Sequence, residues 1–345
     1  MGLPHPHAPK VFIVILNWNG LEDTLECLAS VAQLDYPFRQ TLVVDNGSTD
    51  GSPERLRIAY PNLILIEHRA NLGYTGGNNA GMRYAMTHGA DYVWLLNNDA
   101  VVEPTSLSRL VTTASQDENI GLISPSIYDY SERDRVQFVG ELADVARQRL
   151  IRAPDPREAQ PARSSYRPVL WGTALFVRST VIQRVGYLDD RYFAYFEDFD
   201  YSLRALDAGF RILVEPEALV YHKWAGSSGA DSPFRVYLFT RNWYRFWSTQ
   251  LRGIPKYRYL PRYVAWAIRQ AVSFKEAGNR RAAEACFDGI WNAIRGRYGP
   301  PGHAIPMPGP IKRILYTHSY LSIWLLTGEL RKILHAIGAR LRSRR

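Results

Sequence analysis

The chain has 345 residues, a formal net charge of +9 and two cysteines. This length allows one or two domains with a substantial core, and the spacing around Cys27 and Cys286 fits neither a disulfide framework nor a zinc site. The longest apolar runs are too short to span a bilayer, and the N-terminus lacks the apolar region of a signal peptide. These features predict a cytoplasmic protein that is soluble or peripheral to a membrane.

The charge divides the chain into two parts. Residues 231–345 contain 21 Lys and Arg but 5 Asp and Glu, whereas residues 1–230 contain 21 and 28. Nucleic acid, a phosphorylated lipid and an anionic membrane all suit such a basic segment, and charge alone does not choose among them. We expect a main domain over residues 1–230 and a basic extension over residues 231–345.

Short apolar runs alternate with helical segments in the first hundred residues. The runs cover residues 11–16, 41–45, 63–68 and 92–97 and are rich in Val, Ile and Leu, as in strands buried on both faces. The segments between them are long enough for crossover helices. This order predicts an α/β fold with a doubly wound, mostly parallel sheet, whose ligands bind beyond the carboxyl ends of the strands.

Residues 129–167 are polar, charged and proline-bearing, and predict a hairpin and a mobile loop. A second ordered block is expected over residues 169–222. After it the sequence becomes rich in aromatic residues and arginine.

The first two expected strands end in polar turns. Asn17 and Asn19 follow the first strand, and Asp45 and Ser48 follow the second. The Asp45 carboxylate can accept a hydrogen bond from a nucleobase or a ribose hydroxyl, but the same residue types are ordinary turn and helix-cap chemistry. No GxGxxG pattern follows the first strand, which argues against a dinucleotide-binding domain.

The loop after the third strand is glycine-rich and opens a helix. It contains Asn71, Gly76, Gly77 and Asn78. Glycines let backbone N–H groups approach a ligand, and the positive end of the helix suits a diphosphate or a sugar hydroxyl.

The fourth strand runs into Asn97, Asn98 and Asp99. A carboxylate beside amide side chains suits a hard cation, Mg²⁺ or Mn²⁺, that bridges two phosphates, and a cap on the next helix is the structural alternative. His222 follows a later short strand. A lone histidine is usually structural, but its imidazole can also supply a missing metal ligand.

Acidic residues open a further helix with Glu197, Asp198 and Asp200. Acids at this position complement the helix dipole. The functional alternative is a general base that takes the proton of a hydroxyl attacking an anomeric carbon. Glu197 and Asp200 can instead orient that hydroxyl, and Asp200 can pair with Arg204 one turn later.

Seven motifs in this order carry a resemblance to a known family: VILNWNG, VVDNGSTDGS, NLGYTGGNN, LLNNDA, WGTALFVR, FEDFDYSLRALDAGF and YHKWAGSS. Over about residues 10–230 the chain resembles the inverting glycosyltransferase family 2, of GT-A fold, and looks most like its bacterial rhamnosyltransferase-like members. The resemblance implies transfer of a sugar from a nucleotide-diphosphate donor to a hydroxyl of a glycan or lipid-linked acceptor, in a single displacement that inverts the anomeric centre.

The resemblance also implies roles for individual residues. It assigns the nucleotide and its diphosphate to Asn17, Asn19, Asp45, Ser48, Asn71, Gly76, Gly77, Asn78, Asn97 and Asn98. It assigns the donor sugar and the acceptor to Trp171, Gly172 and Glu197, and the catalytic base to Asp198. The family's DxD metal motif corresponds to Asn97-Asn98-Asp99, where the first Asp is absent, so Asp99 and His222 are the expected metal ligands.

The donor is expected to be deoxythymidine-diphospho-rhamnose. A uridine-diphospho hexose is the alternative, because the shape of the pocket, and not a sequence motif, decides between the two donors. A sugar nucleotidyltransferase would carry a basic triphosphate loop after the first strand, which NWNGLED lacks. A non-catalytic nucleic-acid binder is also disfavoured, since the polar loops belong to the acidic part and no nucleic-acid-binding motif appears.

The basic extension lies outside the resemblance. In residues 237–247 aromatic side chains alternate with Arg241 and Arg245, which share one side of a helical wheel with Arg252. A helix with a cationic stripe of this kind fits an anionic membrane surface at the inner face of the cell membrane. It equally fits a helix packed on the main domain, or a contact in a homo-oligomer.

Overall fold

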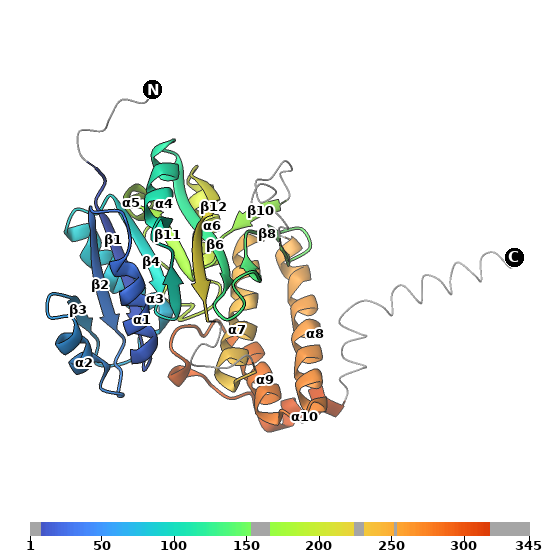
Figure 1. Ribbon diagram of the computed structural model, residues 1–345. Coiled ribbons are helices and arrows are strands. Elements are labelled where there is room, and N and C mark those ends of the chain that lie inside the picture. The colour runs from blue at the N-terminus through green and yellow to red at the C-terminus, as the bar shows by residue number, and fades with distance from the viewer. Residues whose placement is uncertain (1–7, 153–165, 224–230, 252–253, 318–345) are drawn as a thin grey trace, which may run out of the picture. The chain divides into compact units, whose positions relative to one another are not determined.

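The computed structural model describes residues 8–152, 166–223, 231–251 and 254–317. The chain divides into two compact units, Met1–Ser227 and Ser228–Arg345 (Figure 1). The motif residues 224–228, Arg252 and the last 28 residues lie outside the described ranges.

A nine-stranded sheet forms the centre of the first unit, in the order β3-β2-β1-β4-β11-β6-β12-β5, with β7 paired to β6. Its strands are β1 (Val11–Asn17), β2 (Arg39–Asp45), β3 (Ile64–Glu67), β4 (Tyr92–Asn97), β5 (Ala100–Val102), β6 (Ile120–Asp129), β7 (Val136–Phe138), β11 (Ala174–Arg178) and β12 (Arg211–His222). A small sheet, in the order β10-β8-β9, contains β8 (Glu141–Asp144), β9 (Arg149–Arg152) and β10 (Tyr166–Val169).

The predicted α/β architecture is confirmed. Strands β1 to β4 coincide with the four apolar runs of the sequence, and they pair in parallel. The other half of the sheet is mixed, because β11 runs antiparallel between β4 and β6 and β5 runs antiparallel to β12. The hairpin predicted after residue 129 includes β8 and β9, and residues 153–165 of the expected loop lie outside the described residues.

Helices cover both faces of the sheet, as a doubly wound fold requires. They are α1 (Leu21–Ala32), α2 (Ser52–Ala59), α3 (Gly73–Thr87), α4 (Ser106–Ser115), α5 (Ser179–Val185) and α6 (Glu197–Asp207). Alternate side chains of β1 enter two different cores: Ile13 and Ile15 pack with α1, α2 and α4, and Phe12 and Val14 pack with α3, α5 and α6. The strands are therefore buried on both faces, which explains their near-continuous hydrophobicity.

The second unit is helical. It contains α7 (Pro233–Gln250), α8 (Ile254–Glu276), α9 (Arg280–Ile294), the short 3-10 helix η1 (Pro301–His303) and α10 (Gly309–Thr317). Helix α9 packs against both α7 and α8. Side-chain caps start two of the helices, because Ser232 Oγ accepts from the N–H of Arg235 and Asn279 Oδ1 accepts from the N–H of Ala282. Among the described helices we find none with the length and hydrophobicity of a membrane span.

Of the alternatives left open for α7, a cationic stripe facing a membrane is contradicted at Arg241 and Arg245. Arg241 is 1% exposed, and its guanidinium donates to Asn242 Oδ1 at 2.9 Å and to the carbonyl of Gly299 at 2.7 Å. Arg245 is also buried, with its guanidinium 4.8 Å from the ring centroid of Tyr298. Oxygen acceptors and an aromatic face lie against these guanidinium groups inside the protein, so among the described residues Arg241 and Arg245 present no charge to a membrane.

Close packing of α3 on β1 depends on a glycine. A Cβ at Gly81 would stand 2.3 Å from Cγ1 of Val14, a β-branched side chain with little freedom to move. We expect Gly81→Ala to lower the free energy of unfolding by about 1–3 kcal/mol, because overpacking outweighs the better helix propensity of alanine. Urea denaturation measures this loss. Gly302→Ala, where the new Cβ meets open space, is the control and should change stability little.

Candidate active site

The predicted site residues meet at the carboxyl edge of the sheet. Asn17 and Asp45 end β1 and β2 in register, and Asn97 ends β4 opposite Leu16. The N–H of Asn97 donates to the carbonyl of Thr173 at 2.9 Å, which brings the start of β11 to the same edge. His222 at the end of β12 pairs with Ala100. Residues far apart in the sequence therefore converge beyond the strand ends.

Hydrogen bonds join the first two loops. The Asn17 amide donates to Asp45 Oδ2 at 2.7 Å, and Ser48 Oγ accepts from the N–H of Asn19 at 2.9 Å. The second oxygen of Asp45, Oδ1, accepts from the N–H of Ser48 at 2.9 Å. Asn17 and Asp45 are almost completely buried, so in this structure they shape the two loops from within. Asn19 is exposed and can reach a ligand.

An exposed aromatic ring lies in the first of these loops. Trp18 lies between Asn17 and Asn19 and is 38% exposed, although it follows a strand whose apolar side chains are buried or partly buried. A flat indole at a nucleotide-binding edge can stack on a base. The motif residues around Trp18 were singled out from the sequence, but Trp18 itself was not, because exposure is not visible in a sequence.

The third loop is held by a buried asparagine, Asn46. Its amide donates to Asn71 Oδ1 and to the carbonyl of Gly73, both at 3.0 Å, and its oxygen accepts from the N–H of Leu72. Asn71 Oδ1 in turn accepts from the N–H of Gly73 at 2.7 Å. The second and third loops therefore form one hydrogen-bonded unit.

The glycine-rich segment opens α3, as predicted, but two of its residues face the protein. A Cβ at Gly77 would stand 2.3 Å from Cδ1 of Leu16, so this glycine permits close packing of the helix on β1. Asn78 is buried, and its amide donates to the carbonyl of Tyr74. Gly76 is partly exposed. Of these three residues, Gly76 has the surface that a diphosphate would need.

The turn after β4 brings Asp99 beside His222. Asp99 Oδ1 lies 3.3 Å from His222 Nε2, and Gln137 Oε1 lies 2.9 Å from Nδ1 of the same ring. Burial raises the pKa of Asp99, but contact with His222 outweighs burial and the net pKa is lowered. Asn98 turns away and donates to the carbonyl of Gly20 and to Thr24 Oγ1. Asp99 is therefore an anion at neutral pH.

The pair of Asp99 and His222 fits part of a divalent metal site. Oδ1 of Asp99 is a buried oxygen that receives no hydrogen bond of good geometry from any residue that the structure describes, which is the arrangement that a cation relieves. Gln137 orients the imidazole from behind, as outer-sphere partners of metal ligands do. The described residues contain no group of three or more His, Cys, Asp or Glu able to enclose a metal ion. Asp99 and His222 would thus supply two ligands from the described residues, and a diphosphate with water would have to complete the coordination sphere.

Asp198 lies in the first turn of α6 and is fixed by two backbone donors. Its Oδ2 accepts from the N–H of Gly172 at 2.7 Å, and its Oδ1 accepts from the N–H of Phe199 at 2.8 Å. Burial raises the pKa of Asp198 to about 6, against the opposing effect of these hydrogen bonds. A carboxylate with this pKa is mostly ionised at neutral pH and still basic enough to take a proton.

Further acidic groups surround Asp198. Glu197 is buried and its Oε2 has no hydrogen-bond partner among the described residues. Burial, and then the charge of Asp198, raise the pKa of Glu197 well above its usual value. Glu141 Oε2 accepts from Trp171 Nε1 at 2.9 Å, and burial raises the pKa of this carboxyl as well.

Tyr74, in the first turn of α3, contacts the peptide group that follows Gly172. Its hydroxyl donates to the carbonyl of Gly172 at 2.5 Å. Burial first, and then the charges of Glu197, Asp198 and Asp99, raise the pKa of Tyr74 well above its usual value. Glu197, Asp198 and Asp99 therefore lie close enough to the Tyr74 hydroxyl to raise its pKa. Tyr74 belongs to the NLGYTGGNN motif, whereas nothing in the sequence pointed to Glu141 or Gln137.

The loop before α6 has an unusual backbone. Phe193, Tyr195 and Phe196 have φ angles of 66°, 70° and 74°, which non-glycine residues adopt at a cost. Two contacts hold the loop: the Phe193 carbonyl accepts from the N–H of Thr75 at 3.1 Å, and Asn79 bonds both backbone groups of Leu188. This strained loop determines where α6 begins, and therefore where Asp198 lies.

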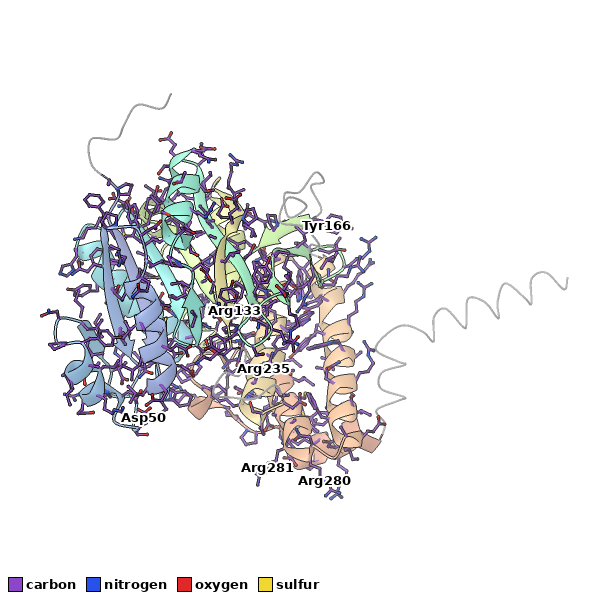
Figure 2. The ribbon with its side chains drawn as sticks, viewed as in Figure 1. Asp50, Arg133, Tyr166, Arg235, Arg280 and Arg281 are labelled. Carbon is purple, nitrogen blue, oxygen red and sulfur yellow. The ribbon has the colours of Figure 1, made fainter. Side chains whose placement is uncertain are left out.

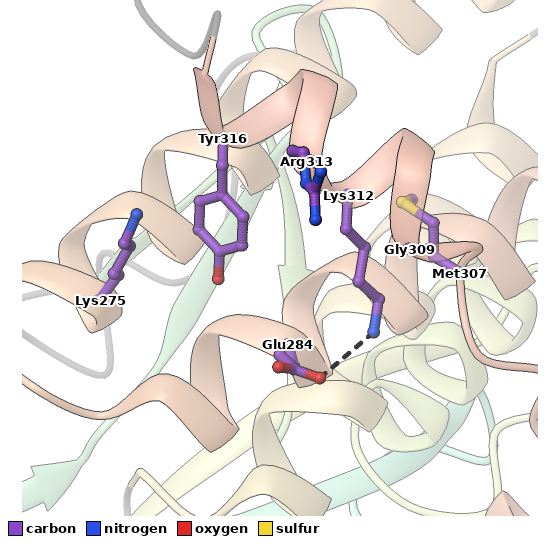
Figure 3. A pocket seen from close by; sticks show the side chains of 7 residues that line it. All are labelled: Lys275, Glu284, Met307, Gly309, Lys312, Arg313 and Tyr316. Atoms are coloured by element: carbon purple, nitrogen blue, oxygen red, sulfur yellow. Dashed lines mark hydrogen bonds and ion pairs between the residues drawn. The ribbon is translucent and has the colours of Figure 1, made fainter.

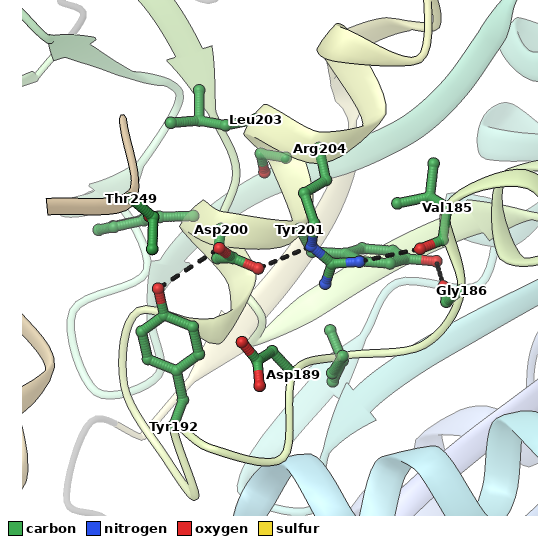
Figure 4. A network of polar contacts seen from close by, with 12 residues as sticks. Val185, Gly186, Asp189, Tyr192, Asp200, Tyr201, Leu203, Arg204 and Thr249 are labelled. Atoms are coloured by element: carbon green, nitrogen blue, oxygen red, sulfur yellow. Dashed lines mark hydrogen bonds and ion pairs between the residues drawn. The ribbon is translucent and has the colours of Figure 1, made fainter. Parts of the chain in front are cut away.

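Asp200 has a structural role, as one of the sequence alternatives predicted. Its Oδ2 lies 2.7 Å from Nε of Arg204, one turn later on α6 (Figure 4). The same guanidinium donates to the carbonyls of Val185 and Tyr187. Asp200 therefore joins α6 to the loop after α5 through Arg204.

The comparisons with known proteins identify the family. The family model described as glycosyl transferase family 2 matches residues 12–181. An N-acetylglucosaminyl-diphospho-decaprenol L-rhamnosyltransferase of Mycobacterium tuberculosis is 31% identical over 245 residues, which cover 66% of this chain and 80% of the relative. A low-salt glycan biosynthesis hexosyltransferase of Haloferax volcanii is 26% identical over 235 residues, covering 67% and 73%.

Solved structures share the fold at low sequence identity. A mannosyltransferase of Pyrobaculum calidifontis, solved with GDP-mannose and Mn²⁺, matches with a TM-score of 0.50 and 16% identity, over 92% of this chain and 81% of its own. The structure of GalNAc-T7 with UDP, GalNAc and Mn²⁺ matches with a TM-score of 0.52 and 15% identity, over 72% and 53%. The predicted GT-A fold is confirmed. The match to the family model and the sequence identity to these relatives show that this chain belongs to glycosyl transferase family 2 and is a glycosyltransferase.

Proposed function

We propose that this glycosyltransferase moves rhamnose from deoxythymidine-diphospho-rhamnose to a hydroxyl of a lipid-linked glycan, with inversion at the anomeric carbon. The observation that carries the reaction type is the Asp198 carboxylate, fixed by Gly172 and Phe199 at the carboxyl edge with its pKa raised to about 6. The name of the Mycobacterium tuberculosis relative supports the sugar and the acceptor. A hexose from a uridine-diphospho donor is the second candidate, supported by the Haloferax volcanii relative's name.

Asp198 acts as the general base. The acceptor hydroxyl loses its proton to Asp198 as its oxygen bonds to the anomeric carbon, while the bond from that carbon to the diphosphate oxygen breaks. Glu197 is buried beside it with a raised pKa, and its protonated form can donate a hydrogen bond to a sugar hydroxyl without adding a second negative charge. Trp171 and Gly172 border the place where donor sugar and acceptor meet.

The nucleotide lies over the loops that follow β1, β2 and β3. Trp18 stacks on the base, and Asn19, Ser48 and Gly76 offer polar contacts. Asn17, Asp45, Asn71 and Asn78 keep these loops in place, and Asn97 and Asn98 hold the turn that carries Asp99. Asp99 and His222 would hold Mg²⁺ or Mn²⁺, and a bound cation neutralises charge on the departing diphosphate.

Substitution of the base tests the mechanism. We expect Asp198→Asn to lower kcat by at least about a thousandfold, because an amide cannot take the proton, and to leave donor affinity within a few-fold. Initial rates and calorimetric titration with the donor measure the two effects. An equal loss of binding and rate would contradict the assignment.

Asp200→Asn is the matched control, two residues away on the same helix. It removes the charge partner of Arg204, so we expect a stability loss of about 1–3 kcal/mol and a rate per folded molecule within a few-fold of the unmodified chain. Thermal melts of both variants separate folding from catalysis.

The pKa of Asp198 predicts the pH dependence of the reaction. The carboxylate form is the active one, so kcat/KM should be level above pH 6 and fall tenfold per pH unit below it, with an inflection at about 6. Stopped assays in overlapping buffers measure the profile. A level profile down to pH 4 would show that no group with this pKa takes the proton.

A thermal-shift screen identifies the donor. A ligand that binds the native state adds about 2.7 kcal/mol at a hundred times its Kd, so the correct nucleotide sugar should raise Tm by several degrees. With Mn²⁺ present the shift should grow, and in Asp99→Asn this gain should disappear. If no deoxythymidine or uridine diphosphate sugar moves Tm, the proposed donor class is wrong.

A further inference from the structure

Glu141 is an acid without a part in the proposed transfer mechanism. It begins β8 of the small sheet, where it pairs with Val169 of β10 and Arg152 of β9; Tyr166, at the other end of β10, is labelled in Figure 2. Its Oε2 accepts from Trp171 Nε1 at 2.9 Å. Burial raises the pKa of Glu141, so the position is unfavourable for a carboxylate. Acids in such positions occur most often at functional sites.

The hydrogen bond to Trp171 uses one half of this carboxylate. The other oxygen, Oε1, has no hydrogen bond with any residue that the structure describes, and it is not a buried atom. Glu141 and Trp171 are both partly exposed. The Phe138 ring, 3% exposed, stacks on the indole with centroids 5.0 Å apart. A ring and a carboxylate thus fix the indole, while Oε1 of Glu141 stays open to a ligand.

The backbone around Trp171 is attached to α6. The N–H of Gly172 donates to Asp198 Oδ2 at 2.7 Å. On the other side of Trp171, the N–H of Leu170 donates to Ser202 Oγ at 3.1 Å, and the Ser202 hydroxyl donates to the carbonyl of Asp198 at 2.8 Å. The position of the indole is therefore tied to that of the Asp198 carboxylate.

Glu141 also lies close to Asp198. Burial is the main cause of the raised pKa of Asp198, and the charge of Glu141 adds to it. Asp198 is itself partly exposed. A hydroxyl that gives its proton to Asp198 must lie within hydrogen-bond distance of this carboxylate, on the side of the anomeric carbon opposite the leaving diphosphate. Glu141 and Trp171 therefore lie on the acceptor side of the reaction.

We propose that Glu141 and Trp171 form a subsite for the acceptor sugar, in which Glu141 selects the pattern of hydroxyl groups. This inference rests on the proposed role of Asp198 as the base. Oε1 of Glu141 accepts a hydrogen bond from a hydroxyl near the reacting one, and the indole contacts the C–H groups of the sugar ring. A pyranose has hydroxyls around its edge and C–H groups on its faces, so a carboxylate beside an aromatic ring matches it.

The second unit contains a hollow that suits a sugar less well. It has a volume of about 640 Å³ and is lined mainly by residues of α8, α9 and α10 (Figure 3). Its acid, Glu284, lies 3.4 Å from the Lys312 ammonium, and the Lys275 ammonium lies 4.4 Å from the centroid of its ring, Tyr316. Cations of the chain therefore already contact both groups that a sugar would use.

Calorimetric titration of the full chain with an acceptor tests the subsite without the transfer reaction. The probe is N-acetylglucosaminyl diphosphate with a short lipid chain, added in the presence of deoxythymidine diphosphate. We expect Glu141→Ala to weaken acceptor binding roughly tenfold or more, because a hydrogen bond to a charged group is lost, and to leave nucleotide affinity within about twofold. Glu141→Gln should lose less, since its one oxygen can accept from Trp171 or from the sugar.

Monodeoxy analogues of the probe identify the hydroxyl that Glu141 binds. Removal of that hydroxyl should weaken binding to the unmodified chain about tenfold and should hardly affect Glu141→Ala, in which the contact is already lost. A residue that only supports the fold would leave the ratios between analogues unchanged. Trp171→Phe keeps a ring but removes the N–H, so it should weaken binding of every analogue.

Two control variants carry the same chemical changes elsewhere. Glu118→Ala removes an exposed acid, and Trp291→Phe replaces a partly exposed tryptophan of α9. Both should bind the probe like the unmodified chain, and thermal melts should show that all variants fold.

The subsite is overturned if Glu141→Ala binds the acceptor normally, if Glu118→Ala weakens binding as much, or if all analogues give the same ratios in both chains. Acceptor binding that depends on Glu141 would support the subsite even if no donor sugar were transferred. That absence of transfer would contradict the proposed function instead.

Discussion

The hydrogen bond from the Gly172 N–H to the Asp198 carboxylate joins the two elements on which the site depends. Gly172 leads into β11, whose register with β4 is set by the sheet, and Asp198 lies at the start of α6. Tyr74 donates to the carbonyl of Gly172, so both neighbouring peptide groups are held. A Cβ at Gly172 would stand 2.8 Å from the Tyr74 hydroxyl, which explains a glycine here. The carboxylate that we propose as the base is therefore held by backbone, which is less mobile than a side-chain partner.

Buried asparagines hold the loops around this bond. Asn17, Asn46 and Asn79 each use both ends of the amide, as donor and acceptor, to connect different segments of the chain. Loops at a sheet edge carry many backbone groups without partners, and these amides satisfy them. The same network supports the left-handed residues before α6, whose strain would otherwise be relieved by movement of the loop. These rigid loops thus hold the carboxyl groups of Glu141, Glu197 and Asp198 close together, although carboxylates repel one another where they are free to move apart.

The first four strands, and the edge of the sheet at which the site lies, could be predicted from the sequence. The burial and the hydrogen-bond partners of single residues could be predicted less well. The four apolar runs identified β1 to β4, because a strand buried on both faces has a simple pattern, and the i,i+4 spacing identified the Asp200–Arg204 pair. Burial of Arg241 was not foreseeable, since its acceptor is the carbonyl of Gly299, 58 residues away. The inward positions of Asp45 and Gly77 could not be foreseen either. Residues that would contact a ligand and residues that support the loops around it are of the same types, so the motif alone does not distinguish them.

Opposite charges in the two parts of the chain serve different steps. Residues 1–230 carry a formal charge of −7, and a nucleotide diphosphate is itself an anion, so the long-range field opposes donor approach. Local groups must overcome that field: the positive end of α3, and the cation that Asp99 and His222 would hold under the proposed mechanism. Residues 231–345 carry +16 and attract an anionic surface instead. With a lipid-linked acceptor, attraction to the leaflet raises the local concentration of acceptor without requiring basic residues at the catalytic carboxylate, where they would lower the pKa of Asp198 and weaken it as a base.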